Sequence, residues 1–162
     1  MPLATPTRPM PLPERLRDFL GDLFGQAVAV DKAKEFDFAD EDLSLYTGVF
    51  VDDTGAVAGA CVADLAFVAR SGAALAMIPR PVADEAISKG ALEDNLRENF
   101  YEVANIATGL LNGPSVPHIK ISELVEGVPD AVRDLLLRAA GRRSYSIALG
   151  DYGNGTFALF TD

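Results

Sequence analysis

Apolar residues recur at intervals of three and four in three parts of the chain, the spacing that places them on one face of a helix. The first part begins near Glu14. The second runs from about 82 to 112, with Gly90 as a break between two helices. The third is opened by Pro129, covers DAVRDLLLRAA and is expected to end near Gly141. The pattern therefore predicts four helices.

Shorter segments have the pattern of strands. YTGVFV and AVAGACV flank the turn sequence DDTG (52–55), and SYSIALG and TFALF flank the stronger turn sequence DYGNG (151–155), which predicts two hairpins. HIKISELV (118–125) alternates apolar and polar residues as a strand does. Residues 63–78 fit either a helix or a strand. The acidic segment KAKEFDFADEDLSL is expected to connect the first helix to the first hairpin.

A helix followed by a hairpin occurs near both ends of the chain, which suggests an internal duplication. Hairpins pair their strands antiparallel, so we expect an α/β (α+β) protein in which helices pack on a mostly antiparallel sheet. Residues 14–162 suit a single domain. Residues 1–13 hold five of the ten prolines and are expected to form a flexible or extended tail.

Composition argues against several classes of function. The chain is 49% hydrophobic and 23% charged, as soluble globular proteins are. Its formal net charge of −10 argues against binding to nucleic acid or anionic lipid, both of which attract basic surfaces. No apolar run reaches the roughly 20 residues needed to cross a membrane, and no secretory signal is visible. We therefore expect a cytoplasmic protein without membrane insertion.

Few residues are available for metal or nucleophile chemistry. His118 and Cys61 are each the only residue of their kind, which excludes a zinc site built from cysteine and histidine. A Ser–His–Asp arrangement would depend on His118, for which an exposed or hydrogen-bonded role is the better interpretation. The acidic run from Asp37 to Asp42 lacks the glycine and bidentate glutamate of a calcium loop. We predict no metal site and no cofactor of the chain's own.

One predicted helix, which contains ENFYEVANIATGLLN, carries an unusual polar stripe. At about 100° per residue, Glu98, Glu102 and Asn105 lie within about 60° of one another, and Gly109 falls among them. A solvated helix face is the ordinary explanation for carboxylates. However, asparagine and glycine are poor helix formers, and an exposed face could carry lysine or glutamine more easily. The stripe therefore favours a surface that another molecule approaches closely.

The spacing Glu98-x3-Glu102-x2-Asn105-Ile106-x2-Gly109 resembles the signature helix of the CheC/CheX/FliY family of chemotaxis phosphatases. The resemblance implies hydrolysis of the aspartyl phosphate of a CheY-type response regulator. Glu102 would dock onto the active-site lysine of the phosphorylated regulator, and Asn105 would orient the attacking water. Glu98, where the family usually has aspartate or serine, and Gly109 would contact the partner, which would supply Mg²⁺.

The first helix carries a related spacing, Asp18-x3-Asp22-x2-Gly25, with glycine in place of the asparagine. A helix without the amide could not position a water in the same way. One intact motif and one incomplete copy make the chain resemble CheX more than the two-site CheC members. The alternative is that Asp18 and Asp22 are simply solvated.

Two other functions remain open on the sequence. The chain could be a non-catalytic module that binds a response regulator, or a flagellar-switch-like module related to the FliM switch domain. It could also be a structural homodimer in which the stripe meets its symmetry mate, although burying glutamates against glutamates is costly. Dimerisation through a sheet edge or another helix is equally open.

Overall fold

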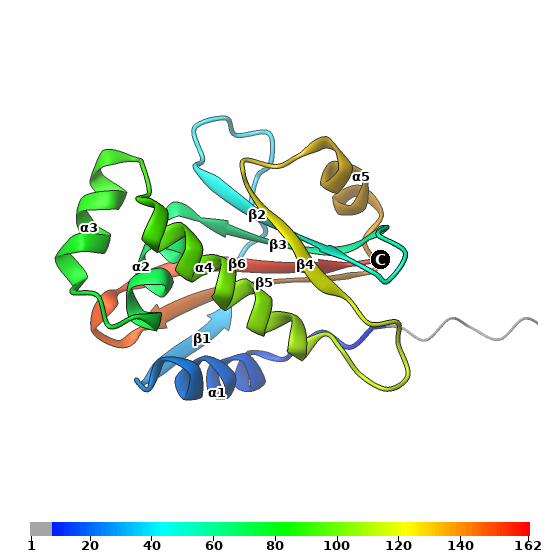
Figure 1. The fold of residues 1–162 in the computed structure, drawn as a ribbon, viewed down its shortest axis with the longest axis horizontal. Helices are drawn as coiled ribbons and strands as arrows, with labels where there is room; N and C mark the ends of the chain where they lie inside the picture. The colour runs from blue at the N-terminus through cyan, green and yellow to red at the C-terminus, as the bar shows by residue number, and fades with distance from the viewer. Residues whose placement is uncertain (1–7) are drawn as a thin grey trace, which may run out of the picture.

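The computed structural model describes residues 8–162, which form a six-stranded sheet with helices on both faces (Figure 1). The α-helices are α1 (Pro13–Phe24), α2 (Leu65–Leu75), α3 (Arg80–Lys89), α4 (Asp94–Ala107) and α5 (Asp130–Arg138). The strands are β1 (Val28–Lys32), β2 (Leu45–Val51), β3 (Val57–Asp64), β4 (Lys120–Glu126), β5 (Gly141–Leu149) and β6 (Asn154–Thr161). Two 3₁₀ turns, η1 (Thr108–Leu110) and η2 (Gly150–Tyr152), follow α4 and β5.

The sheet is antiparallel throughout and has the strand order β1-β5-β6-β3-β2-β4. This order has an internal symmetry. If β1 and β4, β2 and β5, and β3 and β6 exchange places, the same strand order results in the reverse direction. Each half of the chain therefore contributes a helix, a single strand and a hairpin. The expected fold class is confirmed, and the repeat unit is larger than a helix and a hairpin, because α4 and not α5 is the counterpart of α1.

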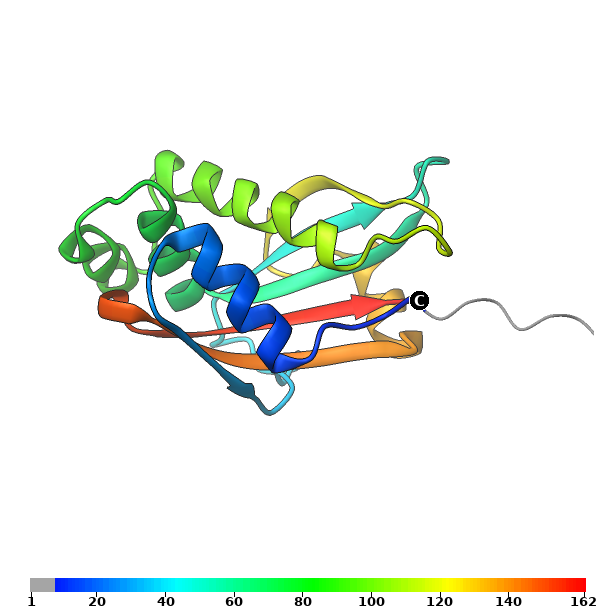
Figure 2. The same cartoon turned by 90° about the horizontal axis from the view of Figure 1, so that it is seen from below.

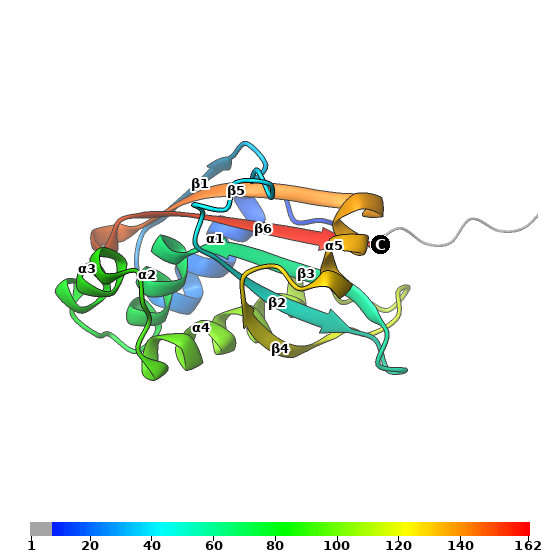
Figure 3. The same ribbon diagram turned by 90° about the horizontal axis from the view of Figure 1, so that it is seen from above.

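Two apolar cores lie on the two faces of the sheet. The helices α1, α2 and α4 cover one face (Figure 2), and α5 covers the other (Figure 3), together with the partly buried Phe36 and Phe38. The central strands contribute to both cores in alternation, so that Phe157 faces the three helices and the neighbouring Ala158 faces the opposite core. This alternation fixes the face of the sheet on which α4 lies.

Several local predictions are confirmed and others are corrected. Gly90 ends α3 with a left-handed φ of 69°, which confirms the break. Residues 63–78 become the end of β3 followed by α2, and Asp64 caps that helix by accepting a hydrogen bond from the Phe67 amide. The strand β1 was not expected. The helix α5 ends at Arg138, and Gly141 lies in β5 instead of terminating a helix.

The proline-rich segment is not a free tail over the part that the structure describes. Residues 1–7 lie outside the described residues. Arg8 is buried, and its guanidinium donates hydrogen bonds to the carbonyl oxygens of Leu111 (2.8 Å) and Pro117 (2.6 Å). The Tyr145 hydroxyl donates to the Pro11 carbonyl at 2.5 Å. These bonds join residues 8–11 to the loop after α4 and to the sheet.

Candidate functional site

The helix α4 is held in place by one apolar face and by contacts with the neighbouring helix α2. Its buried residues are Leu96, Phe100, Val103, Ala104 and Ala107. The backbone of α4 crosses α2 closely, since a Cβ atom added at Gly72 would lie only 2.6 Å from the Leu96 carbonyl oxygen. The Asn99 side-chain amide donates to the Gly72 carbonyl at 3.0 Å. These contacts fix the rotation of α4 and therefore the direction of its opposite face.

The predicted stripe lies on that opposite face of α4 and continues into η1, which holds Gly109. Glu98, Glu102, Asn105 and Gly109 are exposed. Among residues 8–162, neither glutamate forms an ion pair, and the Asn105 side-chain amide makes no hydrogen bond. The Asn105 carbonyl accepts from the Thr108 hydroxyl at 2.6 Å, which tightens the turn into η1. The polar groups of the stripe are thus available to another molecule.

Gly109 has no role that the described structure accounts for. Its φ is not in the left-handed region, and a Cβ atom added there would meet no atom within 4 Å. Gly72, by contrast, is required by the close crossing of α2 and α4. Because glycine lowers helical stability by roughly 1 kcal/mol relative to alanine, its presence in exposed helical backbone calls for another reason. Room for a second backbone or side chain is such a reason.

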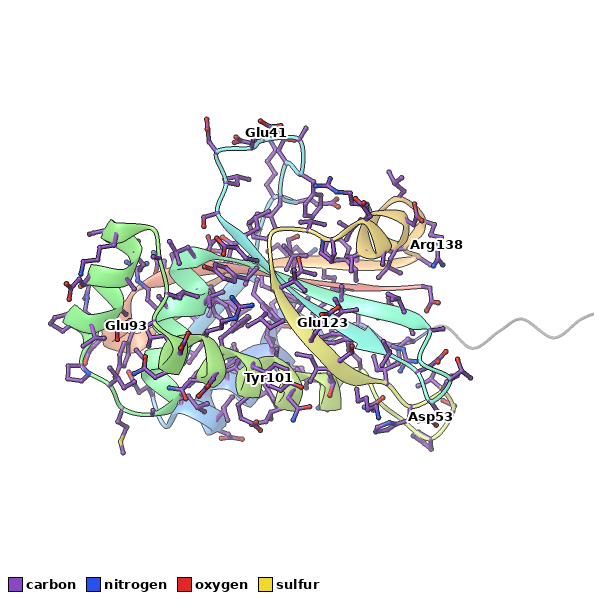
Figure 4. All side chains as sticks on the ribbon, turned by 45° about the horizontal axis from the view of Figure 1, so that its top comes forward. Glu41, Asp53, Glu93, Tyr101, Glu123 and Arg138 are labelled. Atoms are coloured by element: carbon purple, nitrogen blue, oxygen red, sulfur yellow. The ribbon has the colours of Figure 1, made fainter. Side chains whose placement is uncertain are left out.

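A cleft of about 360 Å³ opens beside the N-terminal half of the stripe, between α4 and the edge strand β4. It is lined by Asp94, Arg97, Glu98, Tyr101 and Leu124. Arg97 joins the two elements by donating to the Leu124 carbonyl at 2.9 Å. Figure 4 shows Tyr101 on α4 and Glu123 on β4, which follow neighbouring paths. The sequence motif included only Glu98 of these residues, since the rest of the cleft depends on how β4 lies against α4.

Charge near this cleft affects one buried phenol. The pKa of Tyr46, on β2, is raised chiefly by burial and further by the nearby Glu126 carboxylate, and Arg97 opposes the shift. Arg97 therefore lowers the pKa of Tyr46 electrostatically, and it also donates a hydrogen bond to the Leu124 carbonyl. Its guanidinium is the basic group beside the acidic stripe.

The helix α1 presents the counterpart of the stripe. Adding 80 to the residue numbers of α1 matches its buried positions to those of α4. The pairs are Leu16 and Leu96, Leu20 and Phe100, and Phe24 and Ala104. In this alignment Asp18 and Asp22 correspond to the two glutamates of the stripe, and both are exposed. Gly25 corresponds to Asn105, but it ends α1 with a left-handed φ of 64°, so that helix stops where the amide would stand.

Two general properties bear on the chemistry of the site. Within residues 8–162, no group of three or more histidine, cysteine, aspartate or glutamate side chains could hold a metal ion. Over the same residues, every helix is too short or too polar to cross a membrane. The stripe itself offers carboxylates, an amide and open backbone as its chemical groups.

Comparisons with known proteins identify the fold. The sequence matches no protein-family model and no curated protein. The structure is similar to the FliM middle domain from H. pylori, with a TM-score of 0.62 and 8% identity over 92% of this chain and 84% of that one. A chain of the FliM–SpeE complex from H. pylori gives a TM-score of 0.62 at 11% identity, covering 92% and 80%. A chain of the FliG–FliM complex from H. pylori gives 0.54 at 10% identity, covering 92% and 85%.

The chain shares the fold of FliM middle domains. This is the CheC-like fold that the helix motif implies, so the expectation at the level of fold is confirmed. Identities of 8–11% show the fold alone. The single-motif phosphatase assignment and the roles of the stripe residues stay predictions.

Proposed function

We propose that this protein is a docking module that binds a phosphorylated CheY-type response regulator through the exposed face of α4. The observation that supports the proposal best is the state of the stripe. Glu98, Glu102 and Asn105 are exposed and free of ion pairs or side-chain hydrogen bonds to other residues in 8–162, and Gly109 leaves the backbone open beside them. The likeness to FliM middle domains adds support, because solved complexes of that protein contain FliG or SpeE.

The chemistry of docking follows from the residue types. A carboxylate at Glu102 can form a charge-assisted hydrogen bond to the lysine that a CheY-type regulator uses to hold its phosphoryl group. Glu98 extends the contact along α4 on one side, and Gly109 extends it into η1 on the other. Truncation or charge reversal at Glu102 should therefore reduce the affinity of the complex.

A second candidate function is hydrolysis of the regulator's aspartyl phosphate. It is favoured by the Asn105 amide, which lies about 5 Å along the helix axis from Glu102 at the ordinary helical rise. An amide donates and accepts without titrating, so it can orient a water molecule for attack on phosphorus. Catalysis would consist of positioning, with Mg²⁺ held by the regulator and no metal in this chain.

One experiment separates the two functions. CheY-type regulators from the source organism would be phosphorylated and mixed with wild type, Glu102→Lys or Asn105→Ala, and both binding and phosphate release would be measured. Docking predicts that Glu102→Lys abolishes binding. Catalysis predicts that Asn105→Ala abolishes acceleration of phosphate release and preserves binding.

A matched control is Glu41→Lys, which makes the same charge reversal at an exposed residue. Figure 4 shows Glu41 on the loop before β2, well away from Tyr101 on α4. Equal loss of binding in Glu41→Lys and Glu102→Lys would reduce the proposal to a general effect of net charge. If wild type binds the regulator without accelerating phosphate release, the docking function is supported and the phosphatase function is excluded.

A further inference from the structure

A second cleft, of about 480 Å³, opens between α1 and the end of η1. It is lined by Leu12, Glu14, Arg15, Asp18, Phe19, Asp22 and Leu110. Its volume is within the roughly 300–1,000 Å³ typical of ligand-binding clefts. Figure 2 shows that α1 and α4 cover the same face of the sheet, so the cleft opens on the side of the molecule that carries the stripe.

The two walls of this cleft are joined by Arg8. This residue precedes the cleft residue Leu12 by four positions, and it binds the carbonyl of Leu111, the residue directly after Leu110. Only 6% of Arg8 is exposed, and its second hydrogen bond, to Pro117, holds the following loop. A cationic group at this carbonyl also suits the negative end of the α4–η1 helix. The cleft is therefore formed before any ligand arrives, which lowers the entropic cost of binding.

The chemistry of the cleft combines an apolar floor with an acidic rim. Phe19 is half-buried and Leu110 is buried. Three carboxylates line the cleft against one basic side chain, Arg15. Asp18 is already paired with Arg17 at 3.2 Å, whereas neither Glu14 nor Asp22 forms an ion pair with any other residue in 8–162. A long aliphatic stem with a cationic head matches this arrangement, because the stem can lie on the floor while the head reaches the free carboxylates of the rim.

We infer that the α1–η1 cleft receives a lysine or arginine side chain of the protein that docks on α4. Leu110 is five residues beyond Asn105, which corresponds to roughly 8 Å along the helix. An interface of ordinary size, about 800 Å² on each partner, spans both positions easily. The inference rests on the proposed docking function, and it adds a second basic contact to the one at Glu102.

The cleft itself can be tested without any regulator. The probe is N-acetyl-arginine N-methylamide, titrated into isotope-labelled protein and followed by NMR. The matched probe is the citrulline analogue, which has the same shape and no charge. We expect saturable shifts at residues 12–22 and 109–111, with arginine binding up to about fivefold more tightly than citrulline, the largest ratio typical of one exposed ion pair. Asp22→Asn should reduce this preference, and Asp22→Asn combined with Glu14→Gln should remove it. Asp31→Asn, an exposed change on β1, should keep it.

Two results would overturn the inference. One is equal chemical-shift changes with the arginine and citrulline probes. The other is arginine-induced changes that are no larger at the cleft than at the acidic loop 37–42. Where a phosphorylated regulator binds, Asp22→Asn should weaken that binding by a similar factor. Unchanged affinity for the regulator would overturn the assignment of the cleft to that partner. Failure of the docking function is a separate result, seen as the absence of any regulator binding by wild type, and the arginine titration does not depend on it.

Discussion

Replacing Gly109 with alanine should stabilise the fold and weaken the complex. The backbone at residue 109 is helical in φ, and the new methyl group would meet no atom within 4 Å. Glycine-to-alanine changes of this kind raise the free energy of unfolding by about 0.4–1 kcal/mol, because they restrict the unfolded chain. For a domain of this size the Tm should rise by roughly 1–4 °C.

The effect on binding should have the opposite sign. If the regulator packs directly against the bare backbone, an added methyl group overpacks that contact and costs roughly 1–3 kcal/mol. The Kd of the complex should therefore rise by a factor of about 5 to 150. Thermal unfolding and a binding titration on the same preparations measure both effects.

Gly72→Ala is the control, because it makes the same chemical change where the structure requires glycine. There the Cβ atom would lie 2.6 Å from the Leu96 carbonyl oxygen, so the variant should lose about 1–3 kcal/mol of stability. A Gly109→Ala protein that is more stable and binds as wild type does would refute the idea that Gly109 makes room for a partner. Destabilisation of Gly109→Ala would refute the structural assignment of open space.

Three further predictions address the site, the cap of α2 and the N-terminal segment. Asn105→Ala should change the free energy of unfolding by less than about 0.5 kcal/mol and abolish any acceleration of regulator dephosphorylation; retained acceleration would exclude the amide from the mechanism. Burial raises the pKa of Asp64, so above about pH 4 this carboxyl holds its proton more strongly in the folded protein than in the unfolded chain. The free energy of unfolding, relative to that of Asp64→Asn, should therefore fall as pH rises, until the folded carboxyl is ionised. Denaturant titrations of wild type and Asp64→Asn from pH 4 to 7 measure the difference between their free energies of unfolding. A difference that stays constant with pH would contradict the prediction. Arg8→Met leaves two carbonyls without their donor and should cost about 2–4 kcal/mol, with faster hydrogen exchange in residues 111–119; unchanged exchange there would show that Arg8 does not hold the loop.

The polar stripe could be predicted from the sequence because it depends only on the period of one helix. Once α4 buries Leu96, Phe100 and Val103, the direction of Glu102 and Asn105 follows from 3.6 residues per turn. The hairpins were equally local, since each turn sequence joins strands that are adjacent in the chain.

Features that depend on distant parts of the chain were not predictable in the same way. The strand β1 has five residues at the sheet edge, and its register is set by β5, where Val28 pairs with Leu149. Residues 65–75 showed no helical period because α2 is buried on nearly every side. In the sequence Gly141 has the place of a residue that ends a helix. In the structure it leaves room for the side chains of Thr161 and Met10, which a Cβ atom at this position would meet. Both clefts have walls from separate elements, so no short motif indicated them.

The most direct test of the docking account is the affinity of wild type and Glu102→Lys for a CheY-type regulator in its phosphorylated and unphosphorylated forms. The account predicts that wild type binds the phosphorylated form preferentially, and that Glu102→Lys loses this binding while Glu41→Lys retains it. Binding that is indifferent to phosphorylation, or that survives in Glu102→Lys, would contradict the assignment of α4 as the docking face.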